Sequence, residues 1–201
     1  MNLDTLLLGP TPLAEVAIGV WIAIGAGVLL ILWVAGAYNA LVRRRNHVDE
    51  SWADIETELK RRYNLIPNLV ETVKGYAAHE RETLESVIQA RNAAASPHAS
   101  PKDQARDDNL LSGALRQLFA VVENYPELKA NTNFLELQQE LTNTEDRIQR
   151  SRRFYNANVR DLNTRIEVFP SNIIAGMFGF DQREYFEIED PAQRDAPKVE
   201  F

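Results

Sequence analysis

The chain begins with a long run of apolar residues that carries no charge. From Val16 to Ala37 the sequence reads VAIGVWIAIGAGVLLILWVAGA, which is 22 uncharged residues. A helix of this length rises about 33 Å, and the hydrocarbon core of a bilayer is about 30 Å thick. Trp21 and Trp33 lie near its two ends, where aromatic side chains favour the membrane interface. The pattern predicts a transmembrane helix over residues 16–37, preceded by a short N-terminal segment at 1–15.

A cleaved signal peptide is the alternative interpretation of this stretch. Ala35, Gly36 and Ala37 offer a cleavage pattern of small residues. However, the apolar stretch exceeds the usual signal-peptide core of about 7–15 residues, and no Lys or Arg precedes it. These two features favour an uncleaved anchor.

Beyond the anchor, apolar residues recur with the period of a helix. The stripe comprises Leu41, Val48, Trp52, Ile55, Leu59, Ile66, Leu69, Val73 and Tyr76. Steps of seven, four and three residues are typical of helices that pack as in a coiled coil. The stripe keeps its phase across Pro67 and continues through Leu84, Val87 and Arg91. We therefore predict a single helix, kinked at Pro67, that runs from the membrane to about residue 95.

Two more helices are predicted after the turn-forming residues 96–101. The second helix ends at Tyr125-Pro126, and its apolar face carries Leu111, Ala114, Leu118 and Val122. The third helix begins near residues 131–134, and its stripe comprises Phe134, Leu137, Leu141, Thr144, Ile148, Ser151, Tyr155, Asn158, Leu162 and Arg165. Thr144, Ser151 and Asn158 recur every seven residues, which predicts that they fix the helix register or face polar neighbours. A polar groove lined by these three residues is the alternative.

The chain closes with a short apolar segment and an acidic one. Phe169-Pro170 ends the third helix, and SNIIAGMFGF is predicted to form a short helix with Ser171 as its N-cap and Gly179 as its stop. Residues 188–201 are predicted to form an acidic disordered tail. Because no strand pattern is present, we expect an all-α protein in which residues 38–187 form the helical domain.

Composition and charge restrict the function. The chain has no cysteine among its 201 residues, which excludes disulfides, thiolate metal sites and a cysteine nucleophile. Lys and Arg total 22 and Asp and Glu total 29, so the formal net charge is −7. Nucleic-acid binding depends on the neutralisation of phosphates, so we expect no nucleic-acid partner. The 45% content of hydrophobic residues argues against a disordered protein.

The charges that flank the predicted span indicate its orientation. Arg43, Arg44 and Arg45 follow the span closely, whereas the N-terminal flank carries only Asp4 and Glu15. The positive-inside rule then predicts a single-pass protein of the cell membrane, with its N-terminus outside and its helical domain in the cytoplasm. The three arginines also lie where they could contact anionic headgroups, although a topology signal alone explains them.

Motifs of the common catalytic and metal sites are absent from the sequence. None of His47, His79 and His98 follows a Glu at the spacing of a di-iron bundle, and His79-Glu80 is not continued into a zinc-protease motif. Phosphate loops and nucleophile elbows are missing as well. We therefore predict no catalytic residue, metal or cofactor. The charged surroundings of His79 favour a solvated helix face over an acid–base cluster.

Two groups of residues remain as candidate interaction surfaces. The first is basic, and its members are Lys60, Arg61, Arg62, Arg147, Arg150, Arg152 and Arg153. If the first and third helices pack antiparallel, these residues share a surface for acidic partners or headgroups; ordinary ion pairs with Glu56, Glu58 and Glu145 are the favoured alternative. The second group is apolar and comprises Phe169, Ile173, Ile174, Met177, Phe178, Phe180, Tyr185 and Phe186. We expect it to cap the core of the bundle, or else to dock a partner or a membrane. The interaction surface is predicted to include Lys60, Arg61, Arg62, Arg150, Arg153, Phe178 and Phe180.

Two long blocks of the sequence resemble the LemA family. The first reads YNALVRRRNHVDESWADIETELKRRYNLIPNLVETVKGYAAHERETL, and the second reads TEDRIQRSRRFYNANVRDLNTRIEVFPSNIIAGMFGFDQREYFE. With the anchor, the resemblance covers roughly residues 15–187, and it departs from the family at Asp146, where an Asn is usual. It implies a single-pass bacterial membrane protein with an up-and-down bundle of three to four helices. It implies no catalytic activity, and one branch of the family is associated with building a bacterial membrane organelle.

These observations favour a non-enzymatic, membrane-anchored interaction or scaffold protein. It would contact the bilayer through residues 16–37 and bind a protein partner or a second copy of itself. The alternatives are an accessory or adaptor factor in membrane protein quality control or membrane organisation, and an enzyme that uses His79 or the arginines.

Overall fold

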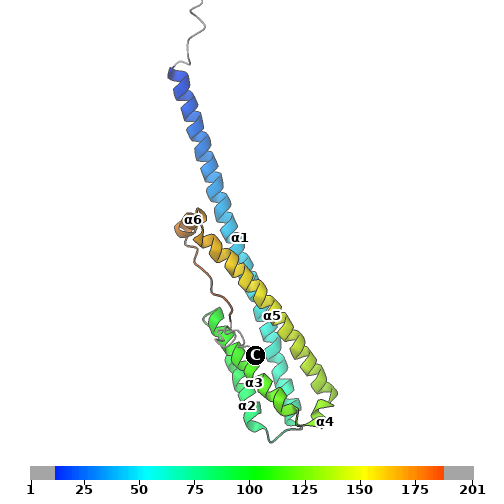
Figure 1. The fold of residues 1–201 in the computed structure, drawn as a ribbon. Helices are drawn as coiled ribbons and strands as arrows, with labels where there is room; N and C mark the ends of the chain where they lie inside the picture. Colours follow the sequence, from blue (N-terminus) through cyan, green and yellow to red (C-terminus); the bar gives the residue numbers. More distant parts are fainter. Residues whose placement is uncertain (1–11, 188–201) are drawn as a thin grey trace, which may run out of the picture. The chain divides into compact units, whose positions relative to one another are not determined.

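The computed structural model describes residues 12–187, with side chains from residue 19 onward. Throughout this range the regular structure is helical. The helices in chain order are α1 (Pro12–Lys74), α2 (Arg81–Ala95), α3 (Pro101–Val122), α4 (Pro126–Lys129), α5 (Thr132–Glu167) and α6 (Ser171–Phe178) (Figure 1). The predicted acidic tail at 188–201 lies outside the described residues. The prediction of an all-α fold is confirmed.

The chain divides into two compact units that share helices α1 and α5. One unit contains the chain up to Arg43 together with Arg165–Asp181, and therefore holds α6. The other contains Arg44–Thr164 and the segment that begins at Gln182. This second unit is the helical bundle, and it holds α2, α3, α4, the second half of α1 and nearly all of α5.

The predicted stripe of the first helix forms the core of the bundle. Its buried members within the bundle are Val48, Ile55, Leu59, Ile66, Leu69 and Val73, and Leu41 is buried in the other unit. Pro67 lies inside α1 and does not end it. The predicted continuation to residue 95 is wrong, because α1 ends at Lys74 and the chain turns before α2 begins. At Gly75 the regular ladder gives way to turn hydrogen bonds, in which the Tyr76 N–H donates to the Val73 carbonyl at 3.0 Å.

Leu84 and Val87 explain why the stripe misled the prediction. Both are buried, but they face the core from α2 rather than from an extended α1. A helical period shows that a segment buries one face; it does not show whether two such segments are one helix or a hairpin. His79 consequently lies in the turn between α1 and α2, not on a helix face.

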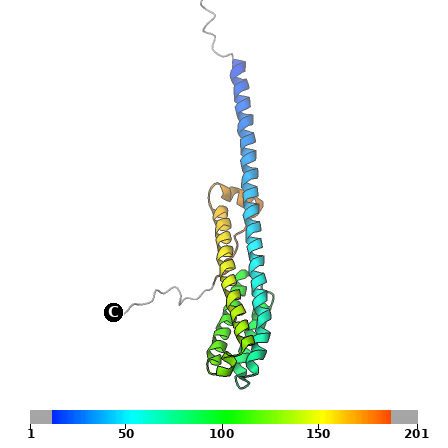
Figure 2. The same ribbon diagram turned by 90° about the vertical axis from the view of Figure 1, so that its right-hand side faces the viewer.

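Helices α1 and α5 run antiparallel within the bundle, side by side in both Figure 1 and Figure 2. Three contacts along the pair establish the direction: they join Arg62 to Glu145, Glu58 to Arg147, and His47 to Asn158. Thr144 and Asn158, which were predicted to fix the register of this helix, make different kinds of contact. Thr144 is buried and donates to Glu140 in its own helix at 2.8 Å, whereas Asn158 donates across to the His47 carbonyl at 3.3 Å.

Helix ends follow local chemistry with one exception. The Asn131 side chain accepts the Phe134 N–H at 3.0 Å at the start of α5, where the third helix was expected. Gly179 ends α6 with a positive φ of 66°, as predicted, because glycine has no Cβ to oppose that conformation. Ser171 is not the N-cap. It is the first residue of α6, and its hydroxyl donates to the Arg165 and Val168 carbonyls at 2.8 and 3.0 Å.

Candidate functional site

A buried arginine joins three helices at the centre of the bundle. Arg62 of α1 is only 1% exposed. Its Nη1 donates to the Glu145 carboxylate of α5 at 2.7 Å and to the Ser112 hydroxyl of α3 at 3.2 Å. Its Nη2 donates to the Asp108 carboxylate of α3. Since an unpaired buried charge is costly, these contacts hold α1, α3 and α5 in one arrangement.

Asp108 is the second buried charge of this cluster. Burial raises the pKa of its carboxyl, and the neighbouring Arg62 guanidinium opposes that rise. The Tyr63 hydroxyl lies 3.4 Å from the same carboxylate, and burial raises the pKa of Tyr63 as well. Gln104 then donates to the Tyr63 hydroxyl at 3.0 Å. The polar groups therefore continue from the ion pair into a hydrogen-bond chain that fixes α3 against α1.

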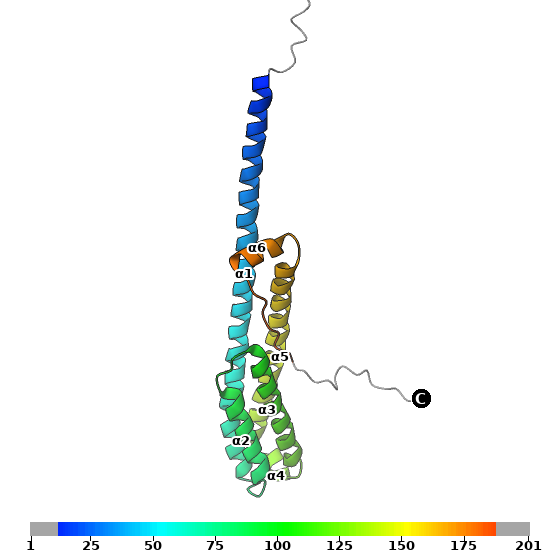
Figure 3. The same ribbon diagram turned by 90° about the vertical axis from the view of Figure 1, so that its left-hand side faces the viewer.

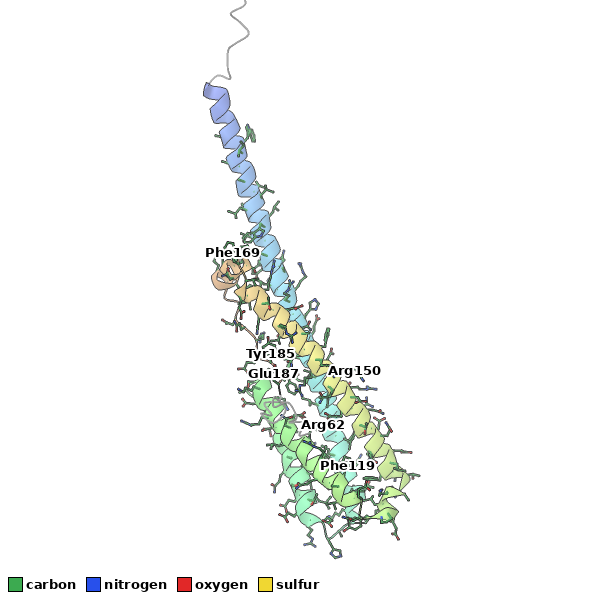
Figure 4. All side chains as sticks on the ribbon, viewed as in Figure 1. Arg62, Phe119, Arg150, Phe169, Tyr185 and Glu187 are labelled. Atoms are coloured by element: carbon green, nitrogen blue, oxygen red, sulfur yellow. The ribbon has the colours of Figure 1, made fainter. Side chains whose placement is uncertain are left out.

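A groove opens beside this cluster, between α3 and α5. Its volume is about 630 Å³, within the range of pockets that hold ligands or anchor side chains. Its apolar lining comes from Ala105, Leu115, Phe119, Leu141, Ile148 and Phe186. Its polar and charged lining comes from Arg62, Asp108, Asn109, Ser112, Arg116, Thr142, Glu145, Asp146, Gln149 and Arg152. Figure 4 labels Arg62 and Phe119, two residues of this lining.

Phe186 is part of the groove lining, and contacts to both its ring and its backbone fix its position. It is 2% exposed, and its ring lies 5.7 Å from the Trp52 ring and 5.9 Å from the Arg152 guanidinium. Both backbone polar groups of Phe186 are bound by Asn156 of α5. Burial lowers the pKa of Arg152 from its usual value. Phe186 is therefore a fixed part of the groove lining.

The predicted basic surface separates into different environments. Arg62 does not belong to it, because the guanidinium is buried in the ion-pair cluster. Lys60, Arg61, Arg150 and Arg153 are exposed, and Arg150 is labelled on α5 in Figure 4. Two of the expected ion-pair partners are used, since Arg62 binds Glu145 at 2.7 Å and Arg147 approaches Glu58 at 3.7 Å. Arg61 pairs instead with Glu140, at 2.9 Å, a partner that was not predicted.

The predicted apolar surface also divides. Phe178 is 51% exposed and Phe180 is buried; both lie in the unit that holds α6. Tyr185 and Phe186 lie in the bundle unit instead. Phe186 is buried in the bundle unit, and the expectation that the whole group caps the bundle core stays a prediction.

Sequence reasoning missed Asp108 and His98. Asp108 lies among four acids and bases at 103–108 and looks like a surface residue; only the helix phase set by Leu111, Leu115 and Leu118 indicates that it faces inward. His98 Nε2 lies 3.0 Å from the Asp107 carboxylate, and this contact helps to lower the pKa of Asp107. Within residues 19–187 no group of side chains has the arrangement of a metal site.

Comparisons with known proteins show the family of this chain. The LemA family model matches residues 51–201, which is three quarters of the chain. The chain belongs to the LemA family. It is 29% identical to Protein LemA of Metamycoplasma hominis over 152 residues, covering 74% of this chain and 68% of that protein.

Two magnetosome proteins are also similar to this LemA-family chain. The identity is 28% to Magnetosome protein MamQ 2 of Paramagnetospirillum magneticum and 27% to Magnetosome protein MamQ of Magnetospirillum gryphiswaldense. Each alignment covers 77% of this chain and 66% of the relative, so the chain spans slightly less than two thirds of their length.

Proposed function

We propose that this LemA-family protein is a non-enzymatic scaffold, anchored in the bacterial cell membrane by α1, that binds a protein partner in the groove between α3 and α5. The groove carries this proposal. Its walls are apolar at Leu115, Phe119 and Ile148, and its lining also carries charges of both signs. An amphipathic helix with apolar anchors and charged flanks fits such a surface.

The buried cluster prepares the groove for binding. Arg62 fixes the α3 and α5 walls through Asp108 and Glu145, so a partner would meet a preformed surface. A preformed surface lowers the ordering cost of association. A groove held open by buried ion pairs supports a binding role better than a catalytic one, since Arg62, Asp108 and Glu145 are already occupied with one another.

Helix α1 supports the membrane anchor. Among the described residues, one helix is long and apolar enough to cross a membrane, by length and composition, and its apolar part is exposed. We further propose that the N-terminus is outside and the bundle is cytoplasmic, because the arginines follow the span. A Glu136→Cys variant is a unique reporter in this cysteine-free chain. A membrane-impermeant maleimide should label this cysteine only after lysis. Labelling in intact cells would show that the bundle lies outside, which contradicts the proposed orientation.

Site-specific crosslinking tests the groove. A Gln149→Cys variant of the full chain, carrying a photoactivatable maleimide, is irradiated in native membranes, with Glu136→Cys as the off-groove control. We expect a discrete adduct from position 149 alone. Its mass should match either two copies of the chain or one copy with another protein.

Groove filling supplies the matched control. Asn109→Trp places a large ring in the groove, whereas Leu110→Trp alters the adjacent exposed residue. The adduct should disappear with Asn109→Trp and persist with Leu110→Trp. If position 149 yields only uncrosslinked monomer, or the same adducts as position 136, the scaffold proposal fails.

Membrane organisation is the second candidate function. The observation that favours it is the similarity to the two MamQ magnetosome proteins. Altered membrane morphology on deletion of the gene, restored by the wild-type chain and not by Asn109→Trp, would support it; unchanged morphology would remove it.

A further inference from the structure

Helix α6 and its flanks carry a concentration of exposed apolar side chains. From Val168 to Phe180 there are 13 residues without a charge, bounded by Glu167 and Asp181. The exposed fraction is 79% for Phe169, 71% for Met177 and 51% for Phe178. Val168 and Ile173 are exposed as well. Single exposed apolar residues are ordinary, but five within one uncharged segment of 13 residues indicate a contact surface.

Two faces of α6 have different environments, although both are apolar. Ile174 and Ala175 are buried. Ile173 and Met177 lie four residues apart on one exposed face of α6, and the exposed Phe169 lies in the turn just before the helix. We refer to these three exposed side chains as the stripe. Figure 4 labels Phe169 at the turn between α5 and α6. Large apolar side chains exposed together mark a surface that contacts a partner or a membrane.

The position of α6 along α1 indicates that the membrane is this contact. Tyr38 directly follows the uncharged stretch that ends at Ala37, and its ring lies 4.9 Å from Phe178 and 5.7 Å from Phe180. Helix α6 is therefore attached where the membrane-spanning stretch ends. Arg43 comes six residues after Ala37, about 9 Å along the helix. The interfacial layer on each side of the hydrocarbon core is about 5–8 Å thick, so α6 lies at the depth of this layer when α1 spans the bilayer.

The direction of α6 fits the same location. Figures 2 and 3 show α6 running across α1 rather than along it. A helix that crosses a membrane-spanning helix lies close to the membrane plane. Interfacial helices adopt this orientation and bury their apolar face at the boundary of headgroups and acyl chains.

We propose that α6 is an interfacial helix that inserts the Phe169–Ile173–Met177 stripe into the bilayer that α1 crosses. The occupant of the exposed face is thus lipid, continuous with the lipid around α1. Arg43, six residues after Ala37, then lies at the depth where it can face anionic headgroups. The protein then contacts one membrane through two elements, a spanning helix and a helix on the surface. The inference rests on the proposed anchoring by α1.

Collision measurements on spin labels test this arrangement. The full chain is reconstituted in vesicles of phosphatidylcholine and phosphatidylglycerol, with single labels at Phe169→Cys or Met177→Cys. The control is Phe154→Cys, an exposed aromatic position of the bundle unit. We expect the ratio of collisions with lipid-soluble oxygen to collisions with a water-soluble nickel chelate to be several-fold higher at positions 169 and 177 than at 154.

A label at Leu29→Cys separates the two proposals. If Leu29 is lipid-accessible and positions 169 and 177 are as water-accessible as 154, the interfacial helix is refuted and the anchor stands. If Leu29 is water-accessible, the anchor itself fails, and the interfacial helix fails with it. Spin–spin broadening at position 177 that disappears on dilution with unlabelled chain would assign the stripe to a second copy and overturn the lipid assignment.

A charge variant tests the stripe directly. Ile173→Glu combined with Met177→Glu changes two exposed side chains, so the fold should be retained. It should reduce the lipid accessibility of a label at position 169 to the level of position 154, because carboxylates oppose insertion. Retained lipid accessibility in this variant would contradict the role assigned to the stripe. Asn172→Glu, at an exposed polar position of the same helix, is the matched control and should leave the label in lipid.

Discussion

Asn156 binds both backbone polar groups of Phe186. Its Nδ2 donates to the Phe186 carbonyl at 3.1 Å, and its Oδ1 accepts the Phe186 N–H at 2.9 Å. Asn163, seven residues further along α5, makes the same pair of bonds to Arg183, both at 2.9 Å. A side-chain amide thus replaces the neighbouring strand that an extended segment would otherwise need. The two asparagines fix the C-terminal segment on α5 and place Phe186 in the groove.

Loss of the Asn156 amide should release this segment. Asn156→Ala removes two hydrogen bonds and leaves the Phe186 backbone without them, at a local cost of about 1–3 kcal/mol. We expect faster amide hydrogen exchange over residues 182–187 with the helices unchanged. Asn143→Ala, at an exposed position of α5, should leave the exchange of the segment as it is. Equal protection of Phe186 in both variants would show that the amide is dispensable.

Removal of the Arg62 guanidinium should destabilise the bundle strongly. Arg62→Met leaves the Asp108 carboxylate buried without its partner, and breaking a buried pair in this way typically costs about 3–5 kcal/mol. The exposed pair of Arg61 and Glu140 provides the comparison, because Arg61→Met should cost no more than about 1 kcal/mol. Denaturation of the full chain, followed by circular dichroism, measures the loss in the free energy of unfolding for both variants.

A double variant shows whether the loss comes from the orphaned charge. Arg62→Met combined with Asp108→Leu removes both buried charges, and it should recover part of the stability lost in Arg62→Met. A double variant less stable than Arg62→Met would mean that Asp108 contributes through Tyr63 and the helix contacts rather than as the counterion of Arg62.

The Tyr155 hydroxyl should lose its proton at a higher pH than an exposed tyrosine, and the stability of the fold should fall at alkaline pH. Burial raises the pKa of Tyr155 to about 12, and its hydroxyl donates to the Glu184 carbonyl at 2.8 Å. The folded state therefore holds this proton more tightly than the unfolded state, in which the pKa of tyrosine is about 10. The contribution to stability is fully present below about pH 10 and is lost as the pH rises toward about 12.

Tyr155→Phe isolates this contribution. The variant has no phenol at this position, so its free energy of unfolding should fall less steeply between about pH 10 and 12 than that of the wild type. The difference in tyrosinate absorbance between the wild type and Tyr155→Phe should rise at about pH 12. An absorbance difference that rises at about pH 10 would contradict the burial of the phenol.

The sequence determined which segments are helical and which faces they bury. The apolar period placed Leu41 through Val73 on the inner face of α1 and Phe134 through Leu162 on that of α5, because hydrophobic burial at a helical repeat needs no knowledge of the partner. Gly179 could be read as a helix stop from its lack of a Cβ alone. The long uncharged stretch before Tyr38 likewise showed a candidate membrane span by length and composition.

Tertiary structure decided how those helices divide and what the polar residues do. Arg61 and Arg62 are adjacent and look alike in the sequence, yet one is exposed and the other is the buried centre of the bundle. Their positions on α1 differ by about a quarter of a helical turn, and this separates solvent from core. The turn at Gly75, the inward-facing Asp108 and the bonds from Asn156 to Phe186 were equally hidden. Arg62, Asp108 and Asn156 each bind a partner distant in sequence. A local pattern records the burial of a residue without recording its partner.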